Sequence, residues 1–309
     1  MKKTTPSSER GAKSPKIAAN QSDNVLHHCW HAVAWARDVA EKPLAVKLLD
    51  HPVVLWRSES GVAAFHDLCI HRGTPLSLGR TENGRIVCAY HGWQYGADGL
   101  CTHIPSLPPD RGIPAKARVG VYHATEKYGL IWVCLKTPVA AIPELPNEIH
   151  DPSYRWDAYS SHGQWKANAA RMIENLLDFS HFPWVHPGIL GDASNTVCEP
   201  SDITPVPGGF QFEIIQPVNR LKAESAAIQR FTVILPLMLF IERRQPDGPE
   251  KQTNIYLCTP ISNKETRFFR LPGGIIATRL PMKNSIKSIK RSSSRIVLSL
   301  KHRDPRNYR

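Results

Sequence analysis

The chain has 309 residues, 41% of them hydrophobic, and a formal net charge of +12, which is enough apolar material for two ordinary domains and excludes a chain disordered throughout. The positive charge lies at the ends: residues 17–269 contain 23 basic and 25 acidic side chains, whereas residues 270–309 contain eleven Lys or Arg and the single acid Asp304. A nearly neutral body argues against a nucleic-acid-binding protein in spite of the high net charge.

The first segment, residues 1–26, is rich in Lys, Ser and small polar residues and shows no periodicity, so we expect a disordered tail. Its basic residues have no apolar stretch behind them, and it therefore lacks the hydrophobic region of a secretory signal. The chain has seven cysteines, an odd number that does not suit a disulfide scaffold. Both observations favour a cytoplasmic protein with reduced thiols or metal-bound cysteines.

Residues 27–139 have the pattern of a small antiparallel β domain. Turn sequences such as Glu-Asn-Gly and Ala-Asp-Gly separate short runs of β-branched and apolar residues. The expected strands are residues 45–49, 53–57, 62–66, 85–90, 120–124 and 130–135. Pro138, Pro143 and Pro146, followed by Asn147, indicate a linker after this domain.

Residues 140–269 have the pattern of a second, α+β domain. The expected elements are a helix over residues 168–182 and long strands over residues 210–217, 226–240, 254–260 and 265–271. The longest mostly apolar run, Phe231 to Ile241, has 11 residues and contains Pro236, whereas roughly 20 residues span a bilayer, so we expect no membrane span. The rest, residues 270–309, is an aberrant basic tail without interleaved aromatic residues or an amphipathic period, and we expect it to bind neither nucleic acid nor anionic lipid.

Two short segments of the first domain each offer one thiolate and one imidazole. Cys69 and His71 are separated by one residue, and after sixteen intervening residues Cys88 and His91 follow, separated by two. Two Cys and two His can hold a zinc ion or a Rieske [2Fe–2S] cluster, in which two imidazoles replace two thiolates on one iron. Zinc fingers usually pair Cys with Cys and His with His, whereas each segment here mixes the two types. The mixture favours a Rieske cluster over zinc.

A second set of metal-ligand residue types lies in the expected helix. Asp178 and His181 are three apart and would share a helical face. His186 lies five residues past His181, about 140° away on a continuous helix, so both rings face one ion only if the helix is interrupted, as Pro183 allows. Two histidines and one carboxylate form the facial triad of a non-haem Fe(II) site. The alternative is ordinary buried hydrogen bonding, and for Asn175 a site-lining amide and a helix-surface hydrogen bond both stay open.

Three motifs, Cys-Ile-His-Arg-Gly-Thr-Pro-Leu-Ser, Cys-Ala-Tyr-His-Gly-Trp and Gly-Leu-Cys-Thr-His-Ile-Pro-Ser, resemble those of Rieske non-haem iron oxygenase α subunits, particularly the vanillate O-demethylase, dicamba demethylase and phenoxybenzoate dioxygenase type. The likeness runs from about residue 27 to 269 and departs at Ile70, where the family often has proline. It implies an α+β architecture, with an N-terminal all-β Rieske domain followed by a helix-grip catalytic domain of the START or Bet v 1-like type.

The resemblance also implies roles for the candidate residues. The [2Fe–2S] cluster would be held by Cys69, His71, Cys88 and His91. The mononuclear Fe(II) would be held by His181 and His186. Asp178 would bridge His181 to a Rieske histidine, His91 by the family's pattern, of a neighbouring subunit and relay electrons to it, which implies a homotrimer.

The family's third iron ligand is an aspartate on a C-terminal helix, and this chain has none in a comparable context. We therefore predict no third carboxylate ligand in the chain as it stands, since Asp304 lies in the unsuitable sequence Arg-Asp-Pro-Arg-Asn. A hypothesis is that the tail is translated out of frame. Moved back by one nucleotide, residues 281–309 can be reread as DEEFDKINQEIFEQDRVVIETQRPEELP, which is similar to the family's C-terminal helix and places its aspartate over Ile296.

Together these features predict the terminal oxygenase component of a Rieske-type system. A reductase or ferredoxin would supply electrons, and O₂ would be used to hydroxylate or oxidatively demethylate an aromatic or other hydrophobic small molecule. Five strand residues either line its pocket or pack the core: Phe231, Ile234, Leu237, Leu239 and Phe240. The main alternative is a Rieske electron-transfer protein whose second domain is catalytically impaired, and a zinc-binding module is the remaining one.

Overall fold

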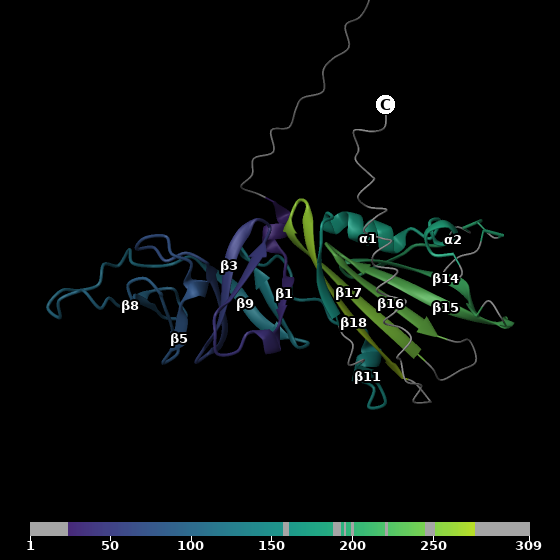
Figure 1. Cartoon of the computed structure of the whole chain (residues 1–309). Helices are drawn as coiled ribbons and strands as arrows, with labels where there is room; N and C mark the ends of the chain where they lie inside the picture. The colour runs from purple at the N-terminus through teal and green to yellow at the C-terminus, as the bar shows by residue number, and fades with distance from the viewer. Residues whose placement is uncertain are drawn as a thin grey trace, which may run out of the picture.

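The structure is a computed structural model that describes residues 24–156, 161–187, 193–194, 196–198, 201–219, 222–244 and 251–275. The described residues form two parts that lie side by side, both built mainly of β-strands (Figure 1). The expected N-terminal tail before residue 24 and the basic tail after residue 275 lie outside the described residues.

The first part contains a six-stranded antiparallel sheet in the order β1-β10-β9-β4-β3-β2. Its elements are η1 (Val25–His28), β1 (His31–Trp35), η2 (Ala36–Asp38), β2 (Leu44–Leu48), β3 (His51–Ser58), β4 (Gly61–His66), β9 (Val121–Lys127) and β10 (Leu130–Cys134). The sequence pattern predicted five of these strands but missed β1. All five residues of β1 are buried, so the strand has no alternation of polar and apolar residues that would reveal it.

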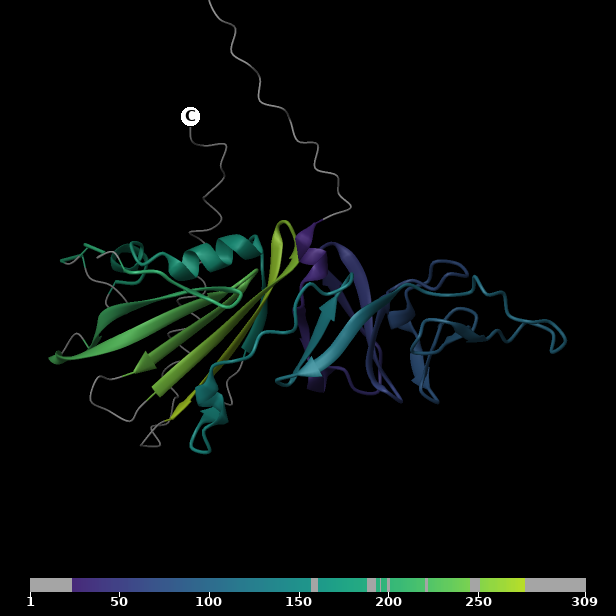
Figure 2. The same cartoon turned by 180° about the vertical axis from the view of Figure 1, so that it is seen from behind.

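A smaller sheet, in the order β5-β6-β7-β8, lies at the outer end of the first part, away from the second part (Figures 1 and 2). Its elements are η3 (Leu76–Leu78), β5 (Arg80–Glu82), β6 (Arg85–Val87), β7 (Gln94–Tyr95) and β8 (Cys101–His103). The expected strand over residues 85–90 therefore ends at Val87. The chain turns there because residues 88–93 form one of the two loops described below.

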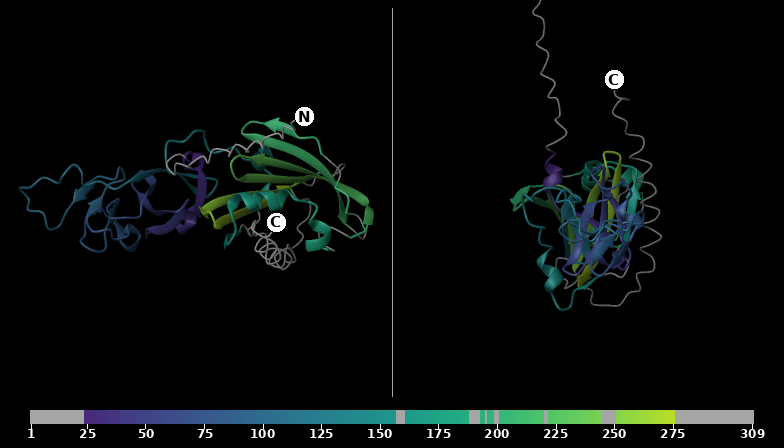
Figure 3. Two further views of the ribbon diagram at one scale, coloured as in Figure 1. Left: turned by 90° about the horizontal axis from the view of Figure 1, so that it is seen from above. Right: turned by 90° about the vertical axis from the view of Figure 1, so that its left-hand side faces the viewer.

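The second part is one antiparallel sheet in the order β11-β18-β17-β16-β15-β14-β13, with β12 also paired to β18. Its elements are η4 (Asn147–His150), β11 (Arg155–Trp156), β12 (Ser161–Trp165), α1 (Ala169–Leu177), α2 (Phe182–Val185), β13 (Thr204–Val206), β14 (Gly209–Asn219), β15 (Lys222–Ile234), β16 (Met238–Arg244), β17 (Lys251–Ser262) and β18 (Glu265–Ile275). The two helices lie across one face of the sheet (Figures 1 and 3).

Two expectations for this part need correction. The single strand expected over residues 226–240 is the hairpin of β15 and β16, because the chain turns at Leu235-Pro236-Leu237, where proline cannot donate to a strand ladder. The helix expected over residues 168–182 ends at Leu177, and a separate short helix, α2, begins at Phe182. β18 continues through position 270 to Ile275, so the strand crosses the boundary drawn from the sequence at residue 269, and the domain bounds stay a prediction.

The two faces of the large sheet have different partners. On one face α1 packs its buried Met172 and Ile173 against strand residues such as Leu239. The opposite face packs against the first part, where Phe269 of β18 meets the ring of Trp35 edge-on at 5.5 Å. The buried Thr259 hydroxyl also donates a 2.6 Å hydrogen bond to the carbonyl of Ala32. Apolar packing and hydrogen bonds thus fix the first part against the second.

Within the part of the chain that the structure describes, no helix has the length and hydrophobicity needed to cross a membrane.

Candidate metal centres

The two cysteine–histidine segments of the first part are loops with the same backbone turn. In the first, the Gly73 N–H donates to the Cys69 carbonyl at 2.9 Å, and in the second the Gly92 N–H donates to the Cys88 carbonyl at 3.0 Å. Both glycines have positive φ, 75° and 68°, a conformation that glycine adopts without a Cβ clash. The repeated Cys-x3-Gly spacing therefore builds two similar turns that face each other across the outer end of the domain.

The four predicted cluster ligands lie on these loops as two pairs, the two thiols and the two imidazoles. Cys69 and Cys88 are almost fully buried, at 1% and 2% exposed. Burial raises the pKa of the Cys69 thiol, hydrogen bonds from Tyr95 and the backbone lower it, and the neighbouring Cys88 thiol raises it further. The ring centroids of His71 and His91 are 4.6 Å apart. Two thiols beside two imidazoles match a cluster in which each iron takes two protein ligands.

His71 supplies a specific test of whether these residues fit a metal cluster. Its Nδ1 is buried and makes no hydrogen bond, although buried polar atoms in native proteins nearly always have a partner. Its pKa is lowered, first by burial and then by the charges of His91 and Arg72, so the ring is neutral, as metal ligation requires. Trp93 stacks on the ring at 4.6 Å. The donor set and the unsatisfied nitrogen both fit a [2Fe–2S] cluster.

Two side chains that hold the loops were not assigned roles from the sequence. The Asp67 carboxylate accepts hydrogen bonds from the Ser77 backbone N–H at 2.8 Å and from the Ser77 hydroxyl at 2.6 Å, which ties the first loop to η3. The Tyr95 hydroxyl lies 3.1 Å from Cys69 Sγ. Residue spacing gives no signal for either contact, since both join residues brought together only by the fold.

The second candidate centre lies where α1 ends and α2 begins. Asp178 caps the C-terminus of α1, His181 precedes α2 and His186 follows it. Pro183 lies in the first turn of α2, where proline is tolerated, so the helix is interrupted earlier than the sequence indicated, at residues 178–181. The two histidines flank a single helical turn, and their ring centroids are 5.2 Å apart. Both can therefore face one ion.

Asp178 and His181 meet although they do not share a helix. Asp178 Oδ2 lies 3.4 Å from His181 Nδ1, which leaves Nε2 of the ring for a metal. Burial raises the pKa of Asp178, but hydrogen bonds from Ser180 and the neighbouring His181 outweigh burial, so the pKa is lowered and the carboxylate is ionised at neutral pH. His181 and His186 are 10% and 1% exposed.

Asn175 is half-buried in the last turn of α1, and its backbone carbonyl accepts the Asp178 N–H.

Within the described ranges, no third His, Cys, Asp or Glu joins a histidine pair in a group that could hold one metal ion. Position 296, where the out-of-frame hypothesis places an aspartate, lies outside the described residues. The roles of the individual ligand residues accordingly stay predictions.

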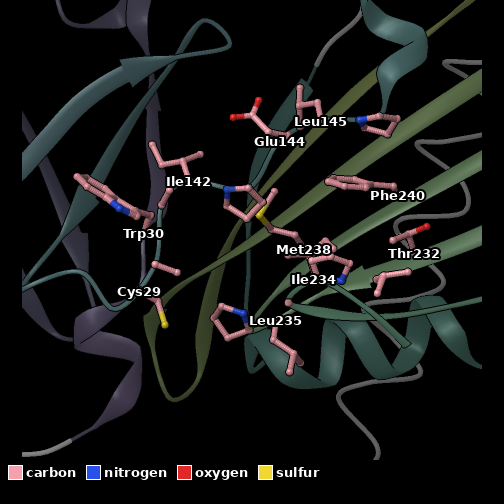
Figure 4. Close-up of a pocket in the computed structure, with 18 of the residues that line it drawn as sticks. Cys29, Trp30, Ile142, Glu144, Leu145, Thr232, Ile234, Leu235, Met238 and Phe240 are labelled. Atoms are coloured by element: carbon pink, nitrogen blue, oxygen red, sulfur yellow. The ribbon is translucent and has the colours of Figure 1, made fainter. Parts of the chain in front are cut away.

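The five apolar residues named as pocket or core candidates divide between the two faces of the sheet. Phe231, Leu237 and Leu239 belong to the core beneath α1, where Phe231 contacts the ring of Phe179 at 5.0 Å. Ile234 and Phe240 instead line a cavity of about 740 Å³ between the opposite face and the linker of residues 139–147 (Figure 4). This cavity is on the far side of the sheet from the cluster that contains Phe179, so it is separate from the second candidate centre.

Comparisons with known proteins match two families in succession along the chain. Residues 29–127 match the family described as Rieske [2Fe-2S] domain, and residues 165–279 match the family described as vanillate O-demethylase oxygenase C-terminal domain. The chain is 33% identical over 263 residues to methylxanthine N1-demethylase NdmA of Pseudomonas putida, covering 81% of this chain and 73% of that protein.

It is also 34% identical over 166 residues to the oxygenase component of dicamba O-demethylase from Stenotrophomonas maltophilia, which covers 52% of this chain and 48% of that protein. Among solved structures, a mutant of Pseudomonas putida CBB5 NdmA with caffeine superposes with a TM-score of 0.81 at 27% identity, over 92% of this chain and 84% of that one. The Rieske domain, the α+β catalytic domain and the relatives give one conclusion: this chain belongs to the Rieske non-haem iron oxygenase α subunits.

Proposed function

We propose that the chain is the terminal oxygenase component of an electron-transfer system. It receives electrons from a reductase or ferredoxin and uses O₂ to hydroxylate or oxidatively demethylate an aromatic or other hydrophobic small molecule. The observation that carries the proposal is the presence of two separate centres on one chain, the paired loops around Cys69 and Cys88 and the histidine pair His181 and His186. An electron-transfer protein alone needs only the first of them.

In this proposal Cys69, Cys88, His71 and His91 hold the [2Fe–2S] cluster, and His181 and His186 hold Fe(II). The cluster supplies one-electron transfer and the mononuclear iron supplies O₂ activation, both of which ordinary side chains lack. The protein's own contribution is geometric. Nearly complete burial of the thiols and of His186 keeps water from the ligands, and Asp67 holds the first loop in place through Ser77.

Asp178 has two parts in the proposed function. Its ionised carboxylate lies 3.4 Å from His181 Nδ1 and favours the tautomer that carries its proton there, which leaves Nε2 for iron. We further propose that it connects His181 to His91 of a neighbouring subunit in a homotrimer. The cluster loops lie at the outer end of the first part and α2 lies at the far end of the second, so the two centres of one chain cannot touch each other (Figure 1).

For the substrate we propose a planar aromatic molecule that carries an N-methyl or O-methyl group. The names of the two relatives describe demethylases, one of methylxanthine and one of dicamba. The core next to the histidine pair is aromatic, because Phe179, Phe212 and Phe231 pack their rings within 5.0 to 6.0 Å of one another. The many buried thiols suit a reducing compartment, so we place the protein in the cytoplasm.

Oxygen consumption with a reductase, NADH and a panel of methylated aromatic compounds tests the proposal. We expect substrate-dependent O₂ uptake with formaldehyde as the second product of demethylation. The variant His181→Ala should lose this uptake and keep the EPR signal of the reduced cluster, whereas His103→Ala, which removes an exposed imidazole of β8, should keep both. The electron-transfer alternative would be favoured by a different result: a chain with its mononuclear iron restored that has a reducible cluster but shows no O₂ uptake with any substrate.

A further inference from the structure

We propose that Arg270 binds a carboxylate group of the substrate, so that the chain selects aromatic carboxylates over neutral aromatic compounds of the same shape. Arg270 lies in β18 and is half-buried. Its partner across the strand pair is Tyr256 of β17, which packs against the core beneath α1. Directly opposite residues share a face of a sheet, so Arg270 lies on the α1 face. The inference rests on the proposed function, because it takes this face as the substrate side.

The guanidinium of Arg270 is held in place and still has hydrogen-bond donors left. Its Nε and Nη2 donate to Oδ1 of Asn254 at 3.0 and 2.5 Å. Another hydrogen bond goes to the hydroxyl of Tyr256, and it partly offsets the rise that burial causes in the pKa of that tyrosine. A guanidinium has five N–H groups, so at least two of them have no acceptor among the described residues. Two parallel N–H groups are what a carboxylate accepts from an arginine.

The charge of Arg270 has no acidic partner among the residues that the structure describes. Its neighbours along the same row of the sheet, Tyr256 in β17 and Leu239 in β16, carry no charge. The opposite face differs, since Arg230 of β15 forms an ion pair with Glu213 at 2.9 Å there. A cation that is partly withdrawn from water is stabilised by an anion close to it. A carboxylate on the ligand supplies that anion, whereas a neutral ligand does not.

Aromatic side chains connect Arg270 with the histidine pair. Tyr256 and Phe179 pack against the same core beneath α1. The ring of Phe182 lies 5.6 Å from that of Phe179 and 5.0 Å from that of His181. Flat rings pack well against such a surface. An aromatic carboxylate therefore has its charged group at Arg270 and its methyl-bearing end towards the proposed iron.

Isothermal titration calorimetry of the full chain tests the inference without turnover. The probes are the methoxybenzoate isomers and the corresponding methoxybenzamides, which have the same shape but no charge. We expect the best benzoate to bind about tenfold more tightly than its amide, because hydrogen bonds to an ionised group are about twice as strong as those to a neutral one. This comparison uses the unaltered protein, so it does not depend on the folding of a variant. Equal or tighter binding of the amides, or no measurable binding of any benzoate, would overturn the proposal.

Variants of Arg270 show whether this residue carries the preference. Arg270→Met keeps an unbranched side chain and removes the charge, so the affinity ratio of benzoate to amide should fall to about one. Arg270→Lys keeps the charge but loses the planar fork, and part of the preference should remain. The matched control is Arg230→Met on the opposite face, which should keep the ratio of the parent protein. An unchanged ratio in Arg270→Met would refute the role of Arg270.

O₂ uptake by a chain with its mononuclear iron restored separates this inference from the proposed function. Demethylation of the amides but not of the benzoates would refute the carboxylate preference and leave the oxygenase function standing. Tighter binding of the benzoates without any O₂ uptake would support the carboxylate site and count against the oxygenase function.

Discussion

Acid is expected to destabilise this protein through a histidine outside both metal centres. His31 lies in β1 at 4% exposed, and its Nε2 is 2.9 Å from the carbonyl of Leu26. Burial lowers its pKa to about 4, against a weaker opposing effect of the hydrogen bond to Leu26, and the charge of His27 lowers the pKa a little more. The folded protein therefore keeps His31 neutral well below the pH at which an exposed histidine is protonated.

The pH dependence of the free energy of unfolding follows from the different proton affinity of His31 in the folded and unfolded chain. Between pH about 6.5 and about 4 the unfolded chain binds a proton at His31 that the folded chain does not, so the free energy of unfolding falls as the pH falls. The stabilisation is fully present above pH 6.5 and is lost progressively down to pH 4. With about 1.4 kcal/mol for each pKa unit, the loss from this residue between pH 7 and pH 4.5 is about 2 kcal/mol.

Urea unfolding at several pH values measures this loss when the protein is compared with the variant His31→Gln. Glutamine keeps a donor for the Leu26 carbonyl but does not titrate, so the stability difference between the two proteins should change by about 2 kcal/mol between pH 7 and pH 4.5. The exposed His103 provides the control, because His103→Gln should follow the pH dependence of the parent protein. Parallel curves for parent and His31→Gln would show that burial of His31 does not carry the effect.

Three further predictions concern the contact between the two parts and the catalytic centre. Phe269→Ala removes a fully buried ring that meets Trp35, and should cost about 3–5 kcal/mol in urea unfolding; a cost below 1 kcal/mol would mean that this contact is unimportant. Asp178→Asn keeps the size and removes the charge, so cluster oxidation followed by rapid-freeze EPR should slow while iron content stays the same, and an unchanged rate would count against the relay. Restoring the proposed reading frame should raise mononuclear iron occupancy measured by metal analysis. Equal occupancy in both forms, or DNA without a one-base change near codon 270, would remove the third-ligand hypothesis.

The sequence predicted the chemistry of the first centre better than its surroundings. The spacing of Cys69, His71, Cys88 and His91 predicts the cluster ligands, and the structure places them on two loops with glycine at the same offset. The contacts that support the loops, such as Tyr95 with Cys69, were not predictable because they join elements whose pairing is decided by the whole sheet. Local pattern gives strands, but the order of the strands depends on long-range packing.

At the second centre, local sequence patterns were insufficient to predict where the helix ends. The helical period over residues 168–182 predicts one helix, but α1 ends at Leu177. The chain then turns before α2, and this turn brings His181 and His186 together. Alternate residues along these strands face opposite sides of the sheet: Phe231 and Leu239 face the helices, whereas Ile234 and Phe240 face the linker. Alternation along a strand separates such sets, but which face receives the helices is known only from the fold.

Iron and acid-labile sulfide content, measured together on the frame-restored chain reconstituted anaerobically with Fe(II) and sulfide, tests the central claim most directly. A [2Fe–2S] cluster held by two cysteines and two histidines, beside a separate iron on His181 and His186, predicts about two sulfides and about three irons per chain. Replacing both His181 and His186 by Ala should then remove one iron and leave both sulfides. A protein without labile sulfide, or a double variant that keeps all its iron, would contradict the account.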